Sequence, residues 1–292
     1  MRGLLVKTII YCSALLPLPT AHGLGSLLGK MLYRIPNRHR HIAQVNIALC
    51  YPHLSTQQQI TLLRSTLIEL GKSIFEIGAL WRWPRHKVLG LIKDVSGEAY
   101  LDEALKKNKG VILALPHLGA WEIIGMYGSA RHRMTSLYHP PSIAAIDKLM
   151  RESRERLGAT LVPTDTTGVR ALYHALKRNH IVAILPDQDP GDSGNVFAPF
   201  FGINTNTMTL ITRIAQKTEA EVLFCFAERL AHGKGYHIHL LPAPTAILDD
   251  DAISAATALN KGIEQCINHC PEQYQWCYKR FKKRPQGESG LY

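Results

Sequence analysis

Residues 111–122 read VILALPHLGAWE, and the expected fold can be worked out from this stretch. Residues 111–115 are all apolar, which is typical of a strand that is buried on both faces of a parallel sheet. A proline and a histidine follow, and a helical pattern begins near residue 120. Because the order strand, loop, helix recurs along the chain, we predict an α/β fold with a mostly parallel central sheet flanked by helices.

The same reasoning places strands and helices along the rest of the chain. Strands are predicted near residues 111–115, 135–138, 160–163, 181–185, 221–227 and 236–241. Helices are predicted near residues 98–107, 120–128, 143–157, 169–178, 207–217 and 251–269. A helical lead-in to about residue 90 precedes them, with a helix from Ser55 to about Leu80 that Ser55 or Thr56 caps. Residues 81–87 are predicted as a basic aromatic loop.

The chain has 292 residues and a formal net charge of +11, and its excess of basic residues lies at the two ends. Residues 1–68 contain seven Lys or Arg and no carboxylate, and residues 279–284 contain five cations in six positions. A nucleic-acid-binding chain would usually interleave aromatics or a recognition helix with such charge, so we predict no nucleic-acid partner. Contact with an anionic membrane surface fits the distribution, and basic tails that serve only solubility are the alternative.

The N-terminal segment has the character of a membrane anchor. An apolar run over residues 3–18 would span about 24 Å as a helix, which is short of the roughly 30 Å hydrocarbon core. A lysine and two prolines interrupt the run, and a second apolar stretch follows over residues 24–33. We interpret residues 1–35 as a retained anchor, interfacial or a broken, tilted span, ahead of a domain over residues 36–292. The flanking cations favour a cytoplasmic body; a cleaved signal peptide and a buried core helix are the alternatives.

The cysteines and three of the histidines are candidate metal ligands. The six cysteines include no CxxC pair, a spacing that suits a reducing compartment. Cys266, His269 and Cys270 lie close together, but no second pair completes a tetrahedral zinc set. His237 and His239 would face the same side of a strand, yet no further ligand is evident near them in the sequence. We therefore predict ordinary buried thiols and no metal site.

The loop after residues 111–115 carries the candidate catalytic pair. In a mostly parallel sheet, ligands bind at the carboxyl ends of the strands. His117 lies on this loop, and Glu122 lies in the first turns of the next helix. We expect Glu122 to accept a hydrogen bond from one imidazole nitrogen, which leaves the other nitrogen free to take a proton as a general base. The alternative is an ordinary structural histidine, one of 14 in the chain.

Residues 117–122, HLGAWE, resemble the HxxxxE motif of the bacterial lipid A biosynthesis acyltransferases, the late lauroyl and myristoyl transferases within the glycerolphosphate-acyltransferase-like superfamily. Four further blocks are similar and occur in the same order as in the family. They are NIALCYP at 46–52, YHP at 138–140 with RERLG at 154–158, LPDQD at 185–189 with FAPFFG at 197–202, and PEQYQW at 271–276. The chain departs from the family pattern at Ala120 and His139, where many members have Asn and Arg.

The resemblance implies transfer of a fatty acyl group from an acyl carrier protein thioester to a hydroxyl of a phosphorylated glycolipid, a lipid A precursor, without a cofactor. It also implies a location at the bacterial inner membrane, with the catalytic domain on the cytoplasmic side. His117 would be the general base, Glu122 its orienting carboxylate, and Arg154 the partner of developing negative charge. Because the chain has no GxSxG elbow, we expect direct attack by the hydroxyl and no acyl-enzyme.

Five further residues are predicted to bind substrate: Asp187, Asp189, Tyr138, Phe200 and Phe201. The two aspartates follow a strand on the same rim as His117, where they would orient Arg154 or bind the acceptor; a turn-forming role is the alternative. The two phenylalanines are candidates for lining an acyl groove, although aromatic clusters of this kind are more often core.

Other functions stay open from the sequence alone. They are an acyltransferase for a different lipid acceptor, a thioesterase-like hydrolase, and a non-enzymatic basic membrane adaptor. If the donor is an acidic carrier protein, a basic docking surface is expected. Candidates for it are Arg131 with Arg133, and Lys106 with Lys107 and Lys109.

Overall fold

The computed structural model describes residues 2–141 and 144–292, and its centre is a seven-stranded sheet with the order β1-β9-β8-β2-β5-β3-β4. The strands are β1 (Ile92–Ser96), β2 (Val111–Ala114), β3 (Met134–Tyr138), β4 (Thr160–Pro163), β5 (Ile181–Ile184), β6 (Asn195–Phe200), β7 (Ile203–Met208), β8 (Glu221–Arg229) and β9 (Tyr236–Pro242). The neighbouring pairs of the large sheet are parallel except for β8 with β9, and β6 and β7 form a separate antiparallel hairpin.

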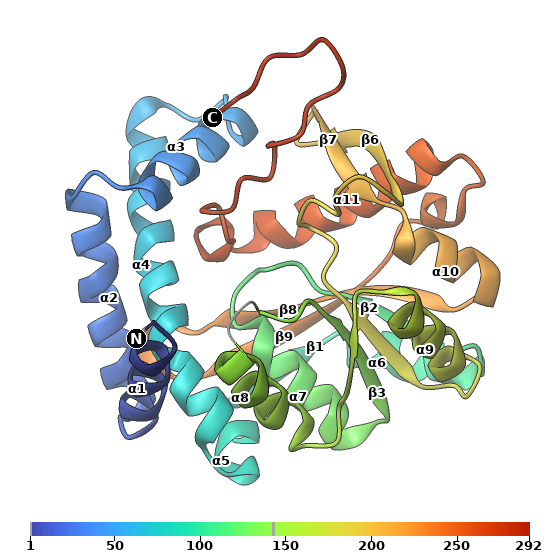
Figure 1. Cartoon of the computed structure of the whole chain (residues 1–292), viewed down its shortest axis with the longest axis horizontal. Coiled ribbons are helices and arrows are strands. Elements are labelled where there is room, and N and C mark those ends of the chain that lie inside the picture. Colours follow the sequence, from blue (N-terminus) through green and yellow to red (C-terminus); the bar gives the residue numbers. More distant parts are fainter. Residues whose placement is uncertain (1, 142–143) are drawn as a thin grey trace.

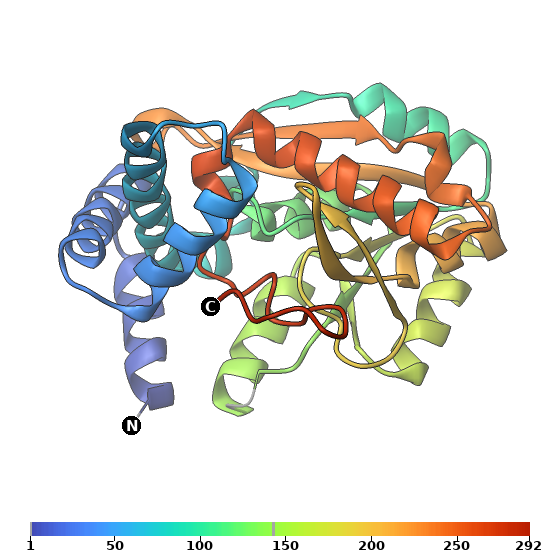
Figure 2. The ribbon, with the colours of Figure 1, turned by 90° about the horizontal axis from the view of Figure 1, so that it is seen from above.

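Helices cover both faces of this sheet (Figure 1). They are α1 (Arg2–Ala14), α2 (Leu18–Arg34), α3 (Arg38–Cys50), α4 (Thr56–Arg82), α5 (Arg85–Leu89), α6 (Glu98–Lys106), α7 (Trp121–Arg131), α8 (Ala144–Glu155), α9 (Thr166–Leu176), α10 (Leu210–Thr218) and α11 (Ala252–His269). Buried residues of α6, α7 and α8 belong to the core on one face, and those of α9, α10 and α11 to the core on the other. The four helices α1 to α4 stand together at one end of the molecule (Figures 1 and 2).

The predicted α/β class with a mostly parallel, helix-flanked sheet is confirmed. The predicted strands and helices occur within a few residues of their expected bounds, except that residue 143 lies outside the described residues. Three strands were not predicted from the sequence. The edge strand β1 is half-exposed and has no apolar run, β6 contains a proline, and four of the six residues of β7 are polar. The loop predicted over residues 81–87 is wrong, because α4 continues to Arg82 and α5 begins at Arg85.

The long helix α4 starts where the sequence predicts. The Ser55 hydroxyl accepts from the backbone N–H of Gln58, and the Gln58 side chain accepts from the N–H of Ser55, so both halves of a capping box are present. Further along, α4 packs on α2 through glycines. A Cβ added at Gly71 would lie 2.0 Å from the carbonyl oxygen of Gly25, so this close helix crossing requires glycine at that position.

Two helices occupy the segment predicted as an anchor. The first, α1, ends at Ala14, and α2 begins at Leu18 with Pro19 in its first turn, where the missing proline N–H costs no intrahelical hydrogen bond. Among the helices of the described residues, none combines the length and the apolar character that a bilayer span requires. The division of the chain at residue 35 stays a prediction.

The C-terminal segment joins the helical end to the α/β body. The side-chain amide of Asn46 on α3 donates to the carbonyl oxygens of Trp276 and Tyr278, at 2.7 and 2.8 Å. The guanidinium of Arg280 donates to the carbonyl oxygen of Asn206 on β7 at 2.6 Å. Two of the sequence blocks, 46–52 and 271–276, are thus brought into contact by backbone hydrogen-bond acceptors.

A buried ionic cluster attaches α4 to the sheet. Both carboxylate oxygens of Glu76 accept from the guanidinium of Arg229 on β8, each at 2.8 Å. The same carboxylate accepts from His22 Nε2 at 3.0 Å and from the Tyr236 hydroxyl at 2.9 Å. Burial by itself would raise the pKa of Glu76, but the charge of Arg229 and the hydrogen bonds from His22 and Arg229 lower it to about 2.

We predict that Glu76→Gln lowers the free energy of unfolding by about 3–5 kcal/mol at pH 7, because the variant leaves Arg229 buried without its counter-charge. The folded-state pKa of Glu76 is depressed, so its contribution is fully present above the unfolded value of 4.5 and is lost as the pH falls toward 2. The difference in melting temperature between wild type and variant should therefore shrink over that range. Circular dichroism in detergent measures it.

Glu103→Gln is the matched control, since Glu103 lies on the exposed side of α6. It should melt close to the wild type at every pH. A Glu76→Gln protein as stable as the wild type at pH 7 would contradict the stabilising role of the cluster.

Candidate active site

His117 and Asp187 meet because of the register between two neighbouring strands. In the parallel pair β2 and β5, Ala114 lies opposite Ile184. His117 and Asp187 each follow three residues later, so the two loops leave the sheet edge side by side. The Nδ1 of His117 lies 2.7 Å from Asp187 Oδ1, and the His117 backbone N–H donates to Asp187 Oδ2 at 2.9 Å. One carboxylate therefore holds both the ring and the backbone of the histidine.

This arrangement leaves the second ring nitrogen of His117 open. The carboxylate of Asp187 can only accept, so Nδ1 carries the hydrogen and Nε2 carries a lone pair. The nearest side-chain donor to Nε2 is the Gln188 amide at 3.4 Å, which is longer than an ordinary hydrogen bond. That amide makes a shorter bond of 3.0 Å to Gln275. An imidazole with a free Nε2 can accept a proton from a substrate hydroxyl.

The buried Asp187 carboxylate stays ionised. Burial would raise the pKa of Asp187, but the charge of His117 and the hydrogen bonds from its ring and backbone outweigh burial and lower the pKa. Because the folded-state pKa is depressed, this carboxylate remains charged at neutral pH and is neutralised only as the pH falls into the acidic range. A fixed negative charge beside Nδ1 also stabilises the imidazolium that forms when Nε2 takes a proton.

The loop that carries His117 is clamped between β8 and the C-terminal segment. The backbone N–H of Ala120 donates to the Ala227 carbonyl at 2.8 Å, and the N–H of Gln275 donates to the His117 carbonyl at 3.1 Å. Arg229 of the buried cluster donates to the Gly119 carbonyl at 2.8 Å. Gly119 has φ of +60°, and a Cβ there would lie 1.9 Å from the Ala227 carbonyl oxygen, so the loop path requires glycine.

Glu122 lies in the first turn of α7 as expected, but its partners differ from the prediction. The carboxylate pairs with the guanidinium of Arg154, which donates from Nε at 2.9 Å and also from Nη2. The indole N–H of Trp81 on α4 donates to the same carboxylate at 3.2 Å. The expectation that Glu122 accepts from the His117 ring is therefore corrected: Asp187 holds that place, and Glu122 holds Arg154.

Glu122 and Arg154 each stabilise the charged form of the other. Burial would raise the pKa of Glu122, but the charge of Arg154, the hydrogen bonds from Arg154 and Trp81 and the charge of His117 lower it overall. Burial would likewise lower the pKa of Arg154, and the charge of Glu122 raises it overall. Because the charge of His117 also acts on Glu122, the His117–Asp187 pair and the Glu122–Arg154 pair are close enough to influence each other.

An apolar pocket opens next to this pair. Its lining comes from α7, α8 and the ends of the strands: Leu115, Trp121, Glu122, Gly125, Met126, Ser136, Leu137, Arg154, Ala159, Leu161, Ala183 and Leu185. Including the part open to solvent, it encloses about 490 Å³. The Trp121 ring stands edge-on to the His117 ring, with centroids 5.2 Å apart, and separates the pocket from a second one toward α4.

The remaining predicted site residues take different places. The Asp189 side chain is fully buried and accepts from the Asn206 amide and the Gly191 N–H at 3.0 and 2.8 Å, an arrangement that fixes the loop. Tyr138 is buried at the end of β3. Phe200 is fully buried in the core, so the structure places it away from an exposed groove, and Phe201 is half-buried with its ring 5.2 Å from that of Tyr51. Their roles in binding substrate stay predictions.

Sequence reasoning missed three contributors to the site. They are Trp81, Gln188 and Gln275. Trp81 donates to Glu122, and the Gln188 amide contacts both His117 and Gln275. Gln188 lies next to Asp187 in the block LPDQD, so the family resemblance could have indicated it. Trp81 comes from the end of α4, 41 residues before Glu122, so only the tertiary structure brings it to the site.

The fold and the site together define an α/β protein with a histidine–aspartate pair and a glutamate–arginine pair at the carboxyl edge of its sheet. The chain belongs to the bacterial lipid A biosynthesis acyltransferases, because the sequence model of that family matches residues 3–283. It is therefore an enzyme of the family of late acyltransferases in lipid A biosynthesis.

Curated relatives are similar in sequence to this chain over nearly its whole length. The lipid A biosynthesis palmitoleoyltransferase of Escherichia coli is 31% identical over 278 residues, which cover 95% of this chain and 90% of the relative. The lipid A biosynthesis lauroyltransferase of the same organism is 28% identical over 285 residues, with 97% and 92% covered. A lipid A biosynthesis acyltransferase of Haemophilus influenzae is 27% identical over 277 residues, with 94% and 86% covered.

Gly119→Ala should displace the His117 loop, because the added methyl would overlap the Ala227 carbonyl and the backbone has positive φ. A displacement of about 1 Å at a catalytic group can cost about 100-fold in rate, so we expect a loss of that size in kcat. Acyl transfer by the purified variant measures it. Gly23→Ala on α2 is the control, since a Cβ there meets nothing within 4 Å. Equal activity of the two variants would contradict the requirement at Gly119.

Proposed function

We propose that this enzyme transfers a fatty acyl group from an acyl carrier protein thioester to a hydroxyl of a phosphorylated glycolipid, a lipid A precursor. The observation that carries the proposal is the free Nε2 of His117 opposite the Nδ1–Asp187 hydrogen bond. A hydroxyl is a poor nucleophile, so a base must take its proton as it attacks. The names of the relatives, a lauroyltransferase and a palmitoleoyltransferase, support a fatty acyl group as the unit transferred.

The reaction can be written with these residues in a single displacement. His117 Nε2 takes the proton of the acceptor hydroxyl while its oxygen attacks the thioester carbonyl carbon. The tetrahedral intermediate collapses as the carbon–sulfur bond breaks, and the imidazolium returns the proton to the departing thiolate. The products are the ester and the free thiol of the carrier. Asp187 keeps the ring in the reactive tautomer throughout, which is the role that we first expected of Glu122.

Arg154 is placed to stabilise negative charge in this reaction. Its Nε and Nη2 hold Glu122, and its side chain lines the apolar pocket. A guanidinium has five N–H donors, so others remain to meet the oxyanion of the intermediate or a phosphate of the acceptor. Glu122 then acts as a positioning residue that fixes Arg154. The neighbouring apolar lining, which includes Leu115, Leu137 and Leu161, suits the acyl chain.

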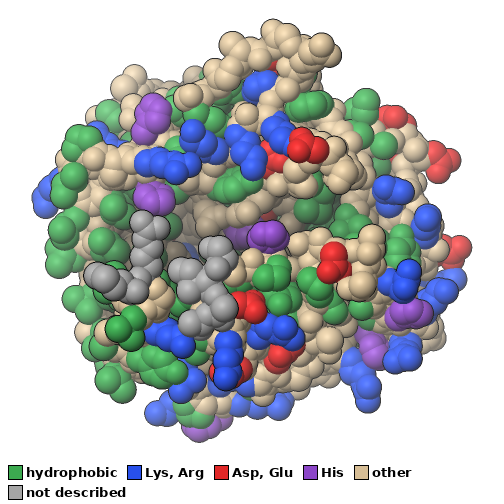
Figure 3. Space-filling view, viewed as in Figure 1, with side chains coloured by type: hydrophobic (Ala, Val, Ile, Leu, Met, Phe, Trp, Pro, Cys, Tyr) green, Lys and Arg blue, Asp and Glu red, His purple; other side chains and the backbone are tan. Residues whose placement is uncertain are grey.

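The acidic carrier protein would dock on the rim of this site. Both candidate patches lie at the amino edge of the sheet, away from His117, because Lys106, Lys107 and Lys109 precede β2 and Arg131 and Arg133 precede β3. Lys107 and Lys109 also pair with Glu221 and Glu219. In the space-filling view, Lys and Arg gather above the hollow in the middle of the molecule (Figure 3). Exposed basic residues of α3 and the C-terminal segment, such as Arg38 and Lys282, favour that side for the acidic partner.

The first two helices supply the membrane contact. Large apolar side chains are exposed along them: Leu4, Leu5, Val6, Tyr11, Leu15, Leu24, Leu27 and Met31. Hydrophobic side chains gather along the left margin of Figure 3, the side on which Figure 1 shows α1 and α2. Lys30 and Arg34 are exposed on α2 beside them, as expected for a surface that meets anionic lipid. We propose that this apolar margin lies in the cytoplasmic face of the inner membrane, next to the lipid acceptor.

We predict that Asp187→Asn and His117→Ala each lower kcat by about 10²–10⁴-fold, because the first loses the reactive tautomer and the second loses the base. The assay follows transfer from a labelled acyl carrier thioester to a lipid A precursor, with free fatty acid measured in parallel. Asp192→Asn is the control, since Asp192 is an exposed acid on the same loop. Undiminished transfer by Asp187→Asn would contradict the mechanism. Release of free acid unaffected by added acceptor would favour a thioesterase-like hydrolase instead.

Leu27→Asp with Met31→Asp should weaken binding to anionic vesicles by at least about tenfold, because the apolar area that would enter the interface becomes charged. Vesicle sedimentation measures the effect. The control is Ile253→Asp, which changes an equally exposed apolar residue on α11. If both proteins bind vesicles alike, α1 and α2 are not the membrane contact.

A further inference from the structure

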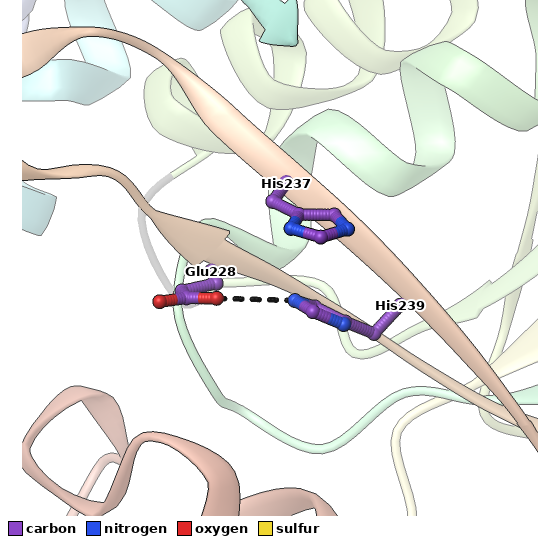
Figure 4. Close-up of side chains that lie close together, drawn as sticks. All are labelled: Glu228, His237 and His239. Carbon is purple, nitrogen blue, oxygen red and sulfur yellow. Dashed lines mark hydrogen bonds and ion pairs between the residues drawn. The ribbon is translucent and has the colours of Figure 1, made fainter. Parts of the chain in front are cut away.

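A cluster of histidines and a carboxylate lies outside the candidate active site, on the two antiparallel strands of the sheet (Figure 4). Glu228 on β8 is directly opposite His237 on β9, and Phe226 is directly opposite His239. Because side chains two residues apart on a strand share a face, Glu228, His237 and His239 project to the same side. No third ligand is evident near the two histidines in the sequence, and the pairing of β8 with β9 provides one in Glu228.

The side chains of this cluster are close enough to share one ion. One ligand atom from each of Glu228, His237 and His239 lies within 4.8 Å of the other two. The Glu228 carboxylate accepts from His239 Nε2 at 3.1 Å, and the two imidazole rings stack with centroids 3.9 Å apart. His269, at the end of α11, brings its Nε2 to 3.4 Å from the same carboxylate. Three imidazoles thus surround one carboxylate.

The hydrogen bonds around the rings leave one nitrogen of His237 available as a ligand. His237 Nε2 lies 2.7 Å from the Ser96 hydroxyl and 3.5 Å from Asp94 Oδ2, which leaves its Nδ1 available as a ligand. A carboxylate on the far nitrogen of a metal-binding histidine is the usual outer partner in such sites. On the other side, Phe226 stacks on His239 with centroids 4.6 Å apart and shields that ring from water.

The charges facing the cluster favour a cation. Glu228 and Asp94 face it from β8 and β1, and Glu272 is near enough to Glu228 that the two charges interact. Opposite charges attract, so these carboxylates would help to hold a divalent cation beside the imidazole rings.

We propose that Glu228, His237 and His239 bind one divalent transition-metal ion of the zinc type, with His269 as the fourth ligand. Nitrogen and carboxylate ligands lie about 2.0–2.2 Å from Zn²⁺ in a tetrahedral site. To bind the ion through Nε2, His239 would take the tautomer with its hydrogen on Nδ1, and the two stacked rings would rotate apart to point their nitrogens at the ion. Imidazole with a single carboxylate selects Zn²⁺ over Mg²⁺, which prefers oxygen ligands.

The position of the cluster indicates what the ion would do. Residues 227 and 229, on either side of Glu228, clamp the catalytic loop through the Ala227 carbonyl and the Arg229 guanidinium. Glu228 itself points to the opposite face, where α11 lies, so the ion would join β8, β9 and the end of α11 behind that clamp. It takes no part in acyl transfer in this arrangement. Its role is to hold the end of β8, and the proposal stands independently of the proposed function.

The test is a titration of the full chain, purified in detergent and stripped with EDTA, with ZnCl₂ alone. We expect one high-affinity Zn²⁺ per chain, a melting temperature that rises with Zn²⁺, and no response to MgCl₂. Glu228→Gln and His237→Gln each change a partly exposed side chain, so both should fold, and each should weaken Zn²⁺ binding at least about tenfold. His174→Gln, on the exposed side of α9, is the control and should leave the affinity unchanged.

X-ray absorption of the zinc-loaded protein should show nitrogen and oxygen ligands without sulfur. Sulfur in the spectrum would place the ion on a cysteine such as Cys266 or Cys270 and would overturn the assignment. Unchanged affinity in Glu228→Gln and His237→Gln would overturn it as well, as would the absence of a stoichiometric site in the wild type.

Discussion

The site depends on a single hydrogen-bonded pair, His117 with Asp187, and that pair depends on the register of β2 against β5. The two side chains stand equally far beyond the paired residues Ala114 and Ile184, so a slip of one residue would separate them. The short parallel strands are buried on both faces, which leaves little freedom for such a slip. The packing of the core, which fixes this register, therefore also fixes the orientation of the His117 ring.

A second constraint ties the helical end of the molecule to the same loop. Arg229 donates from Nε and Nη2 to Glu76 of α4, and Nη2 also donates to the Gly119 carbonyl. Trp81, also on α4, reaches Glu122. Because α2 packs on α4 and its His22 also bonds Glu76, the helices that carry the proposed membrane surface are connected to the loop of the proposed base through α4. This arrangement suits an enzyme whose acceptor is held in a membrane and whose donor arrives from water.

Much of the fold could be predicted from the sequence, because buried parallel strands and amphipathic helices leave periodic apolar patterns. The position of His117 after the first buried strand also followed from sequence. Its partner did not: β3 and β4 separate β2 from β5 along the chain, so strand adjacency was hidden and the nearer Glu122 was chosen. The same limit concealed Glu228 beside His237 and His239, since an antiparallel pairing brought them together. Spacing along the chain predicted elements well and predicted contacts between elements poorly.

The central claim is that Asp187 holds the hydrogen of neutral His117 on Nδ1 and leaves Nε2 free. Nuclear magnetic resonance of the ring nitrogens in protein labelled at histidine tests this most directly, with the His117 signals assigned by their loss in His117→Gln. The account predicts that the proton of the neutral ring is on Nδ1 and that Nε2 has the chemical shift of an unprotonated nitrogen. A neutral ring protonated at Nε2 would contradict it, because that nitrogen could not take the proton of an attacking hydroxyl.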